Sequence, residues 1–167
     1  RPGQWWPQGI NAPTGKHDIP AHLDWDLWLG PATERPYSVG VHPFTWRHFW
    51  DYGNGRLGDF GCHYMDLAHW ALNLRQPTRI ETKGPEVESV TTPRHLQVDY
   101  YHPAIEKRSP VHLTWYGNRT PDIVKALKDS NGKPLNFGSG QLFVGEKGMI
   151  ISNYGEHRLL PESTYKD

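Results

Sequence analysis

The residue types that could support chemistry are concentrated in one stretch, DYGNGRLGDFGCHYMDLAHWALN, at residues 51–73. Asp59, His63, Asp66 and Trp70 are spaced at i, i+4, i+7 and i+11, so in a helix they would share one face. A carboxylate one turn before a histidine can fix the tautomer of the imidazole and raise its basicity. Such a pair can exchange a proton with a substrate hydroxyl as general acid and base. The same spacing also fits an ordinary Asp–His contact on a solvated helix face.

The glycines before this face have a second chemical interpretation. Gly53, Gly55 and Gly58 spell G-x-G-x-x-G, the pattern of a loop that holds the phosphates of a dinucleotide. That interpretation requires a buried parallel strand directly before the first glycine. The preceding residues, TWRHFWDY, contain no aliphatic side chain, so the sequence argues against a dinucleotide site. We expect the glycines to form a tight loop that leads into the helix.

A metal site is a third interpretation, because Asp59, His63 and Asp66 would share a helix face. H-x-x-D-x-x-H is not a strong zinc signature, however, and His69 would point in a different direction from His63. The chain has one cysteine, Cys62, which excludes an internal disulfide and a site built from several of its own thiolates. We therefore expect no bound metal.

The composition argues against nucleic acids and membranes as partners and is compatible with sugars. The 18 Lys and Arg balance the 18 Asp and Glu, whereas a nucleic-acid-binding protein usually has a basic excess. No run of about 18 apolar residues is present, so no membrane span is expected. Eight Trp, eight Tyr and five Phe occur in a chain whose mean hydropathy is −0.74. Rings in such a polar chain suit a sugar-binding surface, although any of them could equally pack in the core.

Two helices are predicted to position these residues. LDWDLWLGP, at residues 23–31, predicts a short helix with Asp24 as its N-cap and Gly30-Pro31 as its end. Residues 58–74 predict the main helix, which would place Asp59 near the N-terminus, where the helix dipole favours a carboxylate. The apolar side of this helix is predicted to consist of Tyr64, Leu67, Ala71 and Leu74.

The rest of the chain alternates polar and apolar residues and predicts strands. The predicted strand segments are TRIETKGPEVESV, HLQVDYYHP, SPVHLTWYG, a hairpin in GQLFVGEKGMIISN that turns at Glu146-Lys147-Gly148, and HRLLP. In VHLTWYG, the side chains of Val111, Leu113 and Trp115 should share one face, and those of His112, Thr114 and Tyr116 the other. We therefore expect one α+β domain over residues 1–167, with an open, mostly antiparallel sheet and one main helix packed on one face.

Two segments, LDWDLWLGPA and HPFTWRHFWDYGNGRLGDFGCHYMDLAHWAL, resemble the C-terminal, substrate-binding domain of the Gfo/Idh/MocA oxidoreductases, which include glucose–fructose oxidoreductase and inositol dehydrogenase. The resemblance covers residues 5 to about 80 closely and the later strands more loosely. It implies an N-terminal Rossmann domain that holds NAD(P). It also implies a C-terminal α+β domain that shapes a sugar or polyol pocket and often forms oligomers through the outer face of its sheet.

The resemblance also implies roles for individual residues. Asp59 and His63 match the catalytic Asp and His of the family, with His63 accepting the proton of the hydroxyl that is oxidised while a hydride passes to the nicotinamide. The expected substrate-binding residues, which supply ring surfaces and polar groups, are Trp46, Arg47, Trp50, Tyr52 and Asp66.

The sequence departs from the family pattern in what it lacks. It contains no Rossmann domain and no E-K-P motif, and its only similar tripeptide, Glu146-Lys147-Gly148, falls in the predicted hairpin. We therefore expect a truncated domain that binds no cofactor itself and is inactive alone. We also expect a homodimer or higher oligomer formed through the sheet.

Three other functions fit the same residues. The chain could be a carbohydrate-binding module without catalysis, using Trp46, Arg47, Trp50 and Tyr52. It could be a metal-assisted lyase or hydrolase that uses His63 and its neighbours. It could also be a structural or assembly fragment that binds no ligand.

Overall fold

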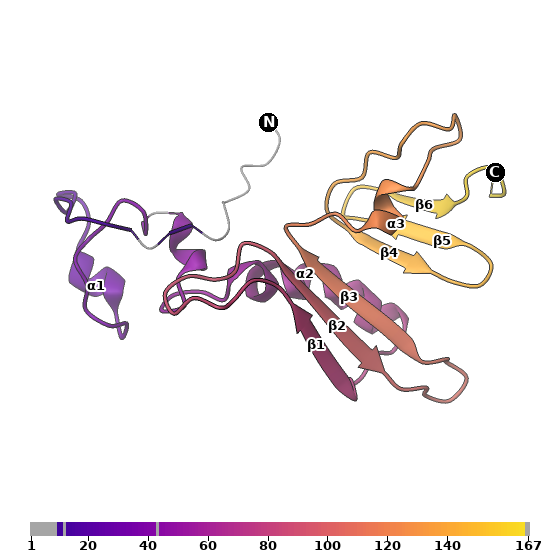
Figure 1. Cartoon of the computed structure of the whole chain (residues 1–167), viewed down its shortest axis with the longest axis horizontal. Coiled ribbons are helices and arrows are strands. Elements are labelled where there is room, and N and C mark those ends of the chain that lie inside the picture. The colour runs from indigo at the N-terminus through magenta and orange to yellow at the C-terminus, as the bar shows by residue number, and fades with distance from the viewer. Residues whose placement is uncertain (1–9, 12, 43, 166–167) are drawn as a thin grey trace.

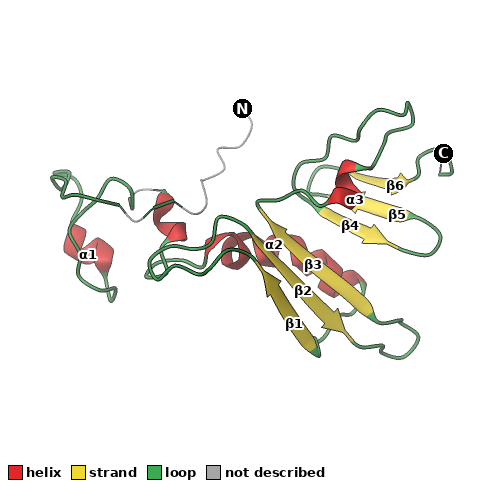
Figure 2. Ribbon diagram, in the orientation of Figure 1, coloured by secondary structure: helices red, strands yellow, loops and turns green. Residues whose placement is uncertain are grey.

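The computed structural model describes residues 10–11, 13–42 and 44–165. In chain order its elements are α1 (Trp25–Leu29), the 3-10 helix η1 (Thr45–His48), α2 (Gly55–Ala71), β1 (Arg79–Lys83), β2 (Leu96–His102), β3 (Val111–Gly117), α3 (Asp122–Lys125), β4 (Gln141–Val144), β5 (Met149–Ser152) and β6 (His157–Leu160). Figure 2 shows α2 as the main helix and the strands gathered beside it and beyond it. This combination confirms the predicted α+β class.

The helix α1 forms where the sequence predicts it. The Asp24 carboxylate accepts a hydrogen bond from the Leu27 amide at 3.0 Å, and Gly30 ends the helix with a φ of 55°. The buried residues of the surrounding N-terminal core are Trp25, Leu29, Tyr37, Val41 and Phe49. This core lies on the left in Figure 1 and is followed in the chain by η1 and α2.

The main helix α2 begins and ends earlier than predicted. It starts at Gly55 rather than at residue 58, because a left-handed φ of 61° at Gly55 turns the chain directly into the helix. It ends at Ala71, and Asn73 follows with a positive φ of 46°. Asp59 therefore lies beyond the first turn, which contains no acidic residue. The expected position of Asp59 at the helix N-terminus was wrong.

The side of α2 that packs inward also differs from the prediction. Gly61 and Ala68 are buried, whereas Ala71, predicted on the apolar side, is exposed. Leu74 is buried, but it lies beyond the end of the helix. Small residues on the inner side let the helix and its neighbours approach closely, and hydrophobic periodicity alone gives such residues little weight.

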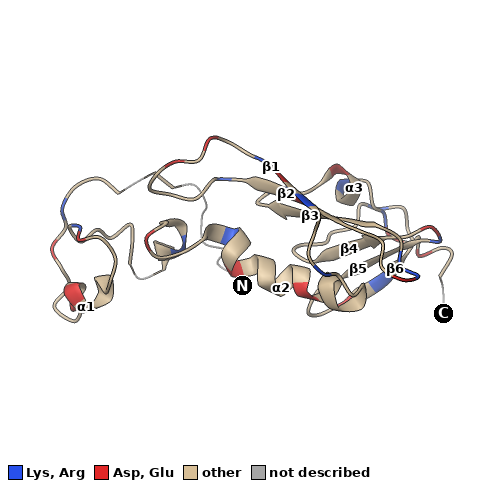
Figure 3. Cartoon of the chain, turned by 90° about the horizontal axis from the view of Figure 1, so that it is seen from below, with Lys and Arg blue, Asp and Glu red and all other residues tan. Residues whose placement is uncertain are grey.

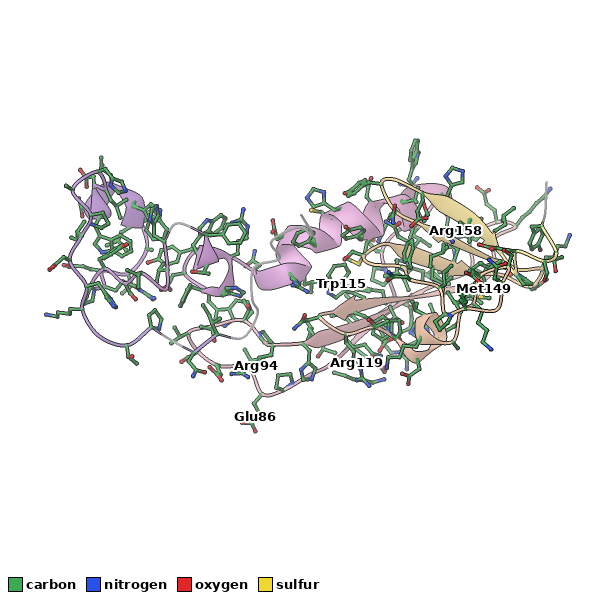
Figure 4. The ribbon with its side chains drawn as sticks, turned by 90° about the horizontal axis from the view of Figure 1, so that it is seen from above. Glu86, Arg94, Trp115, Arg119, Met149 and Arg158 are labelled. Atoms are coloured by element: carbon green, nitrogen blue, oxygen red, sulfur yellow. The ribbon has the colours of Figure 1, made fainter. Side chains whose placement is uncertain are left out.

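The helix α2 covers one face of an antiparallel sheet with strand order β1-β2-β3. It lies behind these strands in Figure 1 and on one side of them in Figure 3. Trp115 of β3 lies between the sheet and α2 (Figure 4) and is paired with Val98 of β2. The predicted alternation in β3 is confirmed, because the neighbouring pair Asp99–Thr114 belongs to the opposite face.

The last three strands form a second antiparallel sheet with strand order β4-β5-β6. The predicted hairpin is confirmed, with residues 145–148 joining β4 to β5. Leu127, Ile151 and Leu160 form a separate core beneath this sheet. The sequence predicted one open sheet, and the structure divides its strands into two. Among the described helices, none has both the length and the apolar composition needed to cross a membrane.

Candidate functional site

The polar and aromatic residues predicted to share a helix face do so. Asp59, His63, Asp66 and Trp70, here called the outer stripe, follow α2 on the side roughly 180° from Gly61 and Ala68. His63 and Asp66 are exposed, and Trp70 is 82% exposed. The outer stripe therefore points away from the β1-β2-β3 sheet and presents its functional groups to the surroundings.

The carboxylate of Asp59 is held by Arg47 of η1. Arg47 Nε lies 3.3 Å from Asp59 Oδ2, and both side chains are partly exposed. The Arg47 guanidinium also lies over the Trp46 ring, 4.3 Å from its centre. The packing of η1 against the start of α2 thus brings together Trp46, Arg47 and Asp59, which were all predicted to bind or act on a substrate. The ion pair of Asp59 is made with Arg47, whereas spacing alone suggested His63.

The imidazole of His63 lies among aromatic rings. Its centre is 6.0 Å from that of Phe60 and 6.4 Å from that of Tyr154, which meets it edge-on. Tyr154 belongs to the turn between β5 and β6, is 77% exposed and also contacts Tyr64, with 5.7 Å between the ring centres. Sequence analysis missed Tyr154, because only the folded chain brings this turn to α2.

Trp50 lies at a different place from His63. It lines a hollow of about 240 Å³, here called the aromatic hollow, whose wall also includes Leu57, Leu96 and Trp115. The indole nitrogen of Trp50 donates a hydrogen bond to the carbonyl of Glu88 at 2.9 Å. Because this hollow lies on the sheet side of α2, Trp50 is separated from the outer stripe by the helix itself.

Tyr52 packs against the N-terminal core. Its ring centre is 4.8 Å from that of Trp28, and the Arg35 guanidinium lies over it at 5.5 Å. Burial raises the pKa of the Tyr52 hydroxyl, although the charge of Arg35 acts in the opposite direction. Tyr52 therefore serves to pack the N-terminal core. Among the residues predicted to bind a ligand, Trp46 and Arg47 lie near Asp59.

The glycines before α2 are explained by close packing. A Cβ atom on Gly53 would lie 2.7 Å from the backbone oxygen of Arg47. A Cβ atom on Gly55 would lie 2.8 Å from Thr92 Oγ1, at a residue that already has a positive φ. At Gly53 and Gly55 these contacts require glycine, so the chain turns tightly into the helix there as predicted, whereas Gly58 lies within α2.

The described residues do not fit a dinucleotide in this loop. The element before the glycines is the 3-10 helix η1, and the strand after α2 is an antiparallel, largely exposed one. The buried βαβ unit that places pyrophosphate at a helix N-terminus is therefore not formed by this segment. Nor do the described residues bring together three or more His, Cys, Asp or Glu side chains as a metal site.

The face of the β1-β2-β3 sheet opposite α2 carries a polar network that the sequence did not predict. Asp99 is 2% exposed and accepts hydrogen bonds from Thr114 at 2.8 Å and Gln97 at 2.9 Å, while His112 Nε2 lies 2.8 Å away. Burial raises the pKa of Asp99, but these three hydrogen bonds and the charge of Lys83 outweigh it and hold the pKa at about 2. The network depends on strand register, which the sequence does not specify by itself.

The comparison with known families agrees with this architecture. The family model described as the oxidoreductase family, C-terminal alpha/beta domain, matches residues 5–105, which include η1, α2, β1 and β2. The chain belongs to the Gfo/Idh/MocA oxidoreductase family, as its C-terminal domain. No curated protein matches the chain by sequence.

Proposed function

We propose that this chain is the substrate-binding domain of a sugar or polyol oxidoreductase and that the outer stripe of α2 meets the substrate. The family match carries the proposal, because it covers the whole of α2 and both members of the predicted acid–base pair. Further support comes from the exposure of His63 and from its aromatic neighbours, since ring faces and edges pack against the C–H groups of sugars.

The proposed chemistry is a proton transfer at His63. The imidazole accepts the proton of the hydroxyl group that is oxidised, and Asp59 favours the resulting imidazolium through its negative charge. Arg47 fixes the position of the Asp59 carboxylate. Asp66, one turn beyond His63, accepts a hydrogen bond from a neighbouring hydroxyl.

The redox partner in this proposal lies outside the chain. NAD(P) is typical of the family, and the close packing around Gly53 and Gly55 supports the proposal that this loop does not hold the dinucleotide. A separate Rossmann domain would cover the outer stripe, and this chain alone would bind substrate without oxidising it.

Calorimetric titration with a panel of sugars, polyols and sugar acids tests the proposal. We expect saturable binding that weakens about tenfold in His63→Asn, which removes the imidazole that meets the substrate hydroxyl, and in Asp59→Asn, which removes the negative charge that makes His63 a better proton acceptor. His157→Asn, a change of another exposed histidine, should leave the affinity unchanged. Binding of no member of the panel, or tight binding of NAD(H) to this chain alone, would contradict the proposal.

A carbohydrate-binding module without catalysis is the second candidate. The observation that favours it is the aromatic hollow, which offers two indole rings on the sheet side of α2, away from His63. If this candidate is right, Trp50→Ala will abolish sugar binding and His63→Asn will have no effect. Trp70→Ala, at an exposed tryptophan outside the hollow, is the matched control.

We further propose that two copies associate through the face of the β1-β2-β3 sheet opposite α2. This polar face consists of Arg79, Glu81, Lys83, Gln97, Asp99, Tyr101, His112, Thr114 and Tyr116. The described elements leave it uncovered in Figure 1. Light scattering should show a dimer that dissociates in Arg79→Glu/Lys83→Glu, and a monomeric wild-type protein at high concentration would contradict this arrangement.

A further inference from the structure

A second hollow, of about 290 Å³, lies at one end of the polar face. Lys83, Gln97 and Tyr116 occupy one row across β1, β2 and β3, and their side chains belong to the polar face. His95 and Arg119, just beyond the strands, complete the wall. Figure 4 shows Arg119 on the side of the sheet away from Trp115 and α2. This cationic hollow is therefore separate from both the outer stripe and the aromatic hollow.

The wall of the cationic hollow carries positive charge and no carboxylate. Lys83 contributes an amino group, Arg119 a guanidinium and His95 an imidazole. Lys83 Nζ is 3.6 Å from Asp99 Oδ2, so its charge is partly compensated. Arg119 makes no ion pair within 4.0 Å and no hydrogen bond among the described residues, and its charge acts only at longer range on the Asp122 carboxylate. Its planar guanidinium is the group best suited to hold an oxyanion by two parallel hydrogen bonds.

The network around Asp99 holds one side of this hollow in place. Gln97 donates from its amide nitrogen to Asp99, and the same carboxylate attracts Lys83. The Gln97 side chain therefore has a defined position before any ligand arrives, which lowers the entropy lost on binding. The Tyr116 hydroxyl supplies a further donor in the wall.

We infer that the cationic hollow binds the phosphate or carboxylate group of a small molecule. The volume lies just below the range of roughly 300–1,000 Å³ found for ligand pockets, which suits a metabolite of a few carbons. A nucleic acid is a poor candidate, because it requires an extended basic surface and the chain has no net charge. This inference does not depend on the proposed oxidoreductase function, but it requires that the end of the polar face with Lys83, Gln97 and Tyr116 stays open in the proposed dimer.

NMR titration of the wild-type chain with inorganic phosphate and with citrate, at constant ionic strength set with sodium chloride, tests the inference. We expect saturable shifts of the Tyr116 and Arg119 amides with at least one of the two anions. Comparison of the two titrations distinguishes a preference for phosphate from one for carboxylate. Arg119→Gln should weaken binding about tenfold, because it removes the guanidinium that could hold the anion by two hydrogen bonds.

Arg94→Gln is the matched control, because Arg94 is a nearby exposed arginine that does not line the hollow. Its substitution should change the affinity less than about twofold if binding is local rather than a response to total charge. Equal weakening in the two variants, or shifts that do not saturate, would overturn the inference. Neither result bears on the sugar titrations, in which the substituted residues Asp59 and His63 lie in α2.

Discussion

His48 illustrates how one buried side chain sets a pH dependence. It is fully buried at the end of η1, and burial, followed by the charge of Arg56, lowers its pKa from 6.5 to about 4. The unfolded chain therefore takes up a proton near pH 6.5, while the folded chain resists protonation until about pH 4. His102, also buried, has its pKa lowered in the same direction by burial and by His69.

We predict that the free energy of unfolding falls as the pH is lowered from 6.5 to 4, by at most about 1.4 kcal/mol per pH unit from His48. Urea unfolding at several pH values across this range should give a free energy of unfolding that changes less with pH in His48→Phe, which removes the titrating group and keeps a large ring. His102 accounts for part of the remaining slope. An unchanged slope in His48→Phe would show that His48 is as easily protonated in the folded state as in the unfolded one.

Asp99 titrates in a lower pH window. Its pKa of about 2 in the folded chain lies below the ordinary value of 3.8, so its contribution to stability is complete above pH 4 and is lost as the pH falls towards 2. At neutral pH, Asp99→Asn should destabilise the fold by about 1–3 kcal/mol, because the amide cannot satisfy the three donors around it. Guanidinium unfolding measures this change. Asp18→Asn, at an exposed carboxylate, should have little effect, and equal stability of the two variants would contradict the role of Asp99.

At the level of elements, the turn into α2 depends on Gly55. Its positive φ and the nearness of Thr92 exclude a side chain at this position. We predict that Gly55→Ala lowers the free energy of unfolding by about 1–3 kcal/mol. Thermal unfolding measures this change. In the same experiment, Gly138→Ala, at a glycine whose Cβ would meet no neighbour within 4 Å, should leave the free energy of unfolding nearly unchanged. If the two substitutions have the same effect, the turn does not require glycine.

The sequence predicted the elements better than it predicted their packing. Asp24 and Gly30 bound α1 as expected, because capping and helix termination are local properties. The inner side of α2 was misjudged, because it is formed by Gly61 and Ala68, which hydrophobic patterns do not emphasise. The division of the strands into two sheets depends on long-range pairing that no local pattern encodes.

In the candidate site too, the positions of residues on one helix could be predicted, whereas the contacts between separate elements could not. The outer stripe follows from helical spacing, so its residues share a face as predicted. The ion pair between Arg47 and Asp59 and the approach of Tyr154 to His63 join separate elements, and they required the fold. The polar network at Asp99 likewise required the register that places Gln97, Thr114 and His112 around it.

In the whole molecule, the three candidate binding regions lie on different surfaces. The outer stripe faces away from the β1-β2-β3 sheet, the aromatic hollow lies between that sheet and α2, and the cationic hollow lies at the end of the polar face. The N-terminal core and the core beneath β4-β5-β6 lie at opposite ends of the chain and position η1 and Tyr154 at α2. This arrangement leaves His63, Asp66 and Trp70 of the outer stripe exposed.

The most direct test of the proposed function is to map a bound sugar or polyol by NMR of the histidine rings and tryptophan indoles. We predict that a saturating ligand shifts the ring signals of His63 and leaves those of His157 and the indole signals of Trp50 and Trp115 unchanged. Signals that shift only at Trp50 and Trp115 would contradict the assignment of the outer stripe as the substrate surface and would favour a binding module without catalysis.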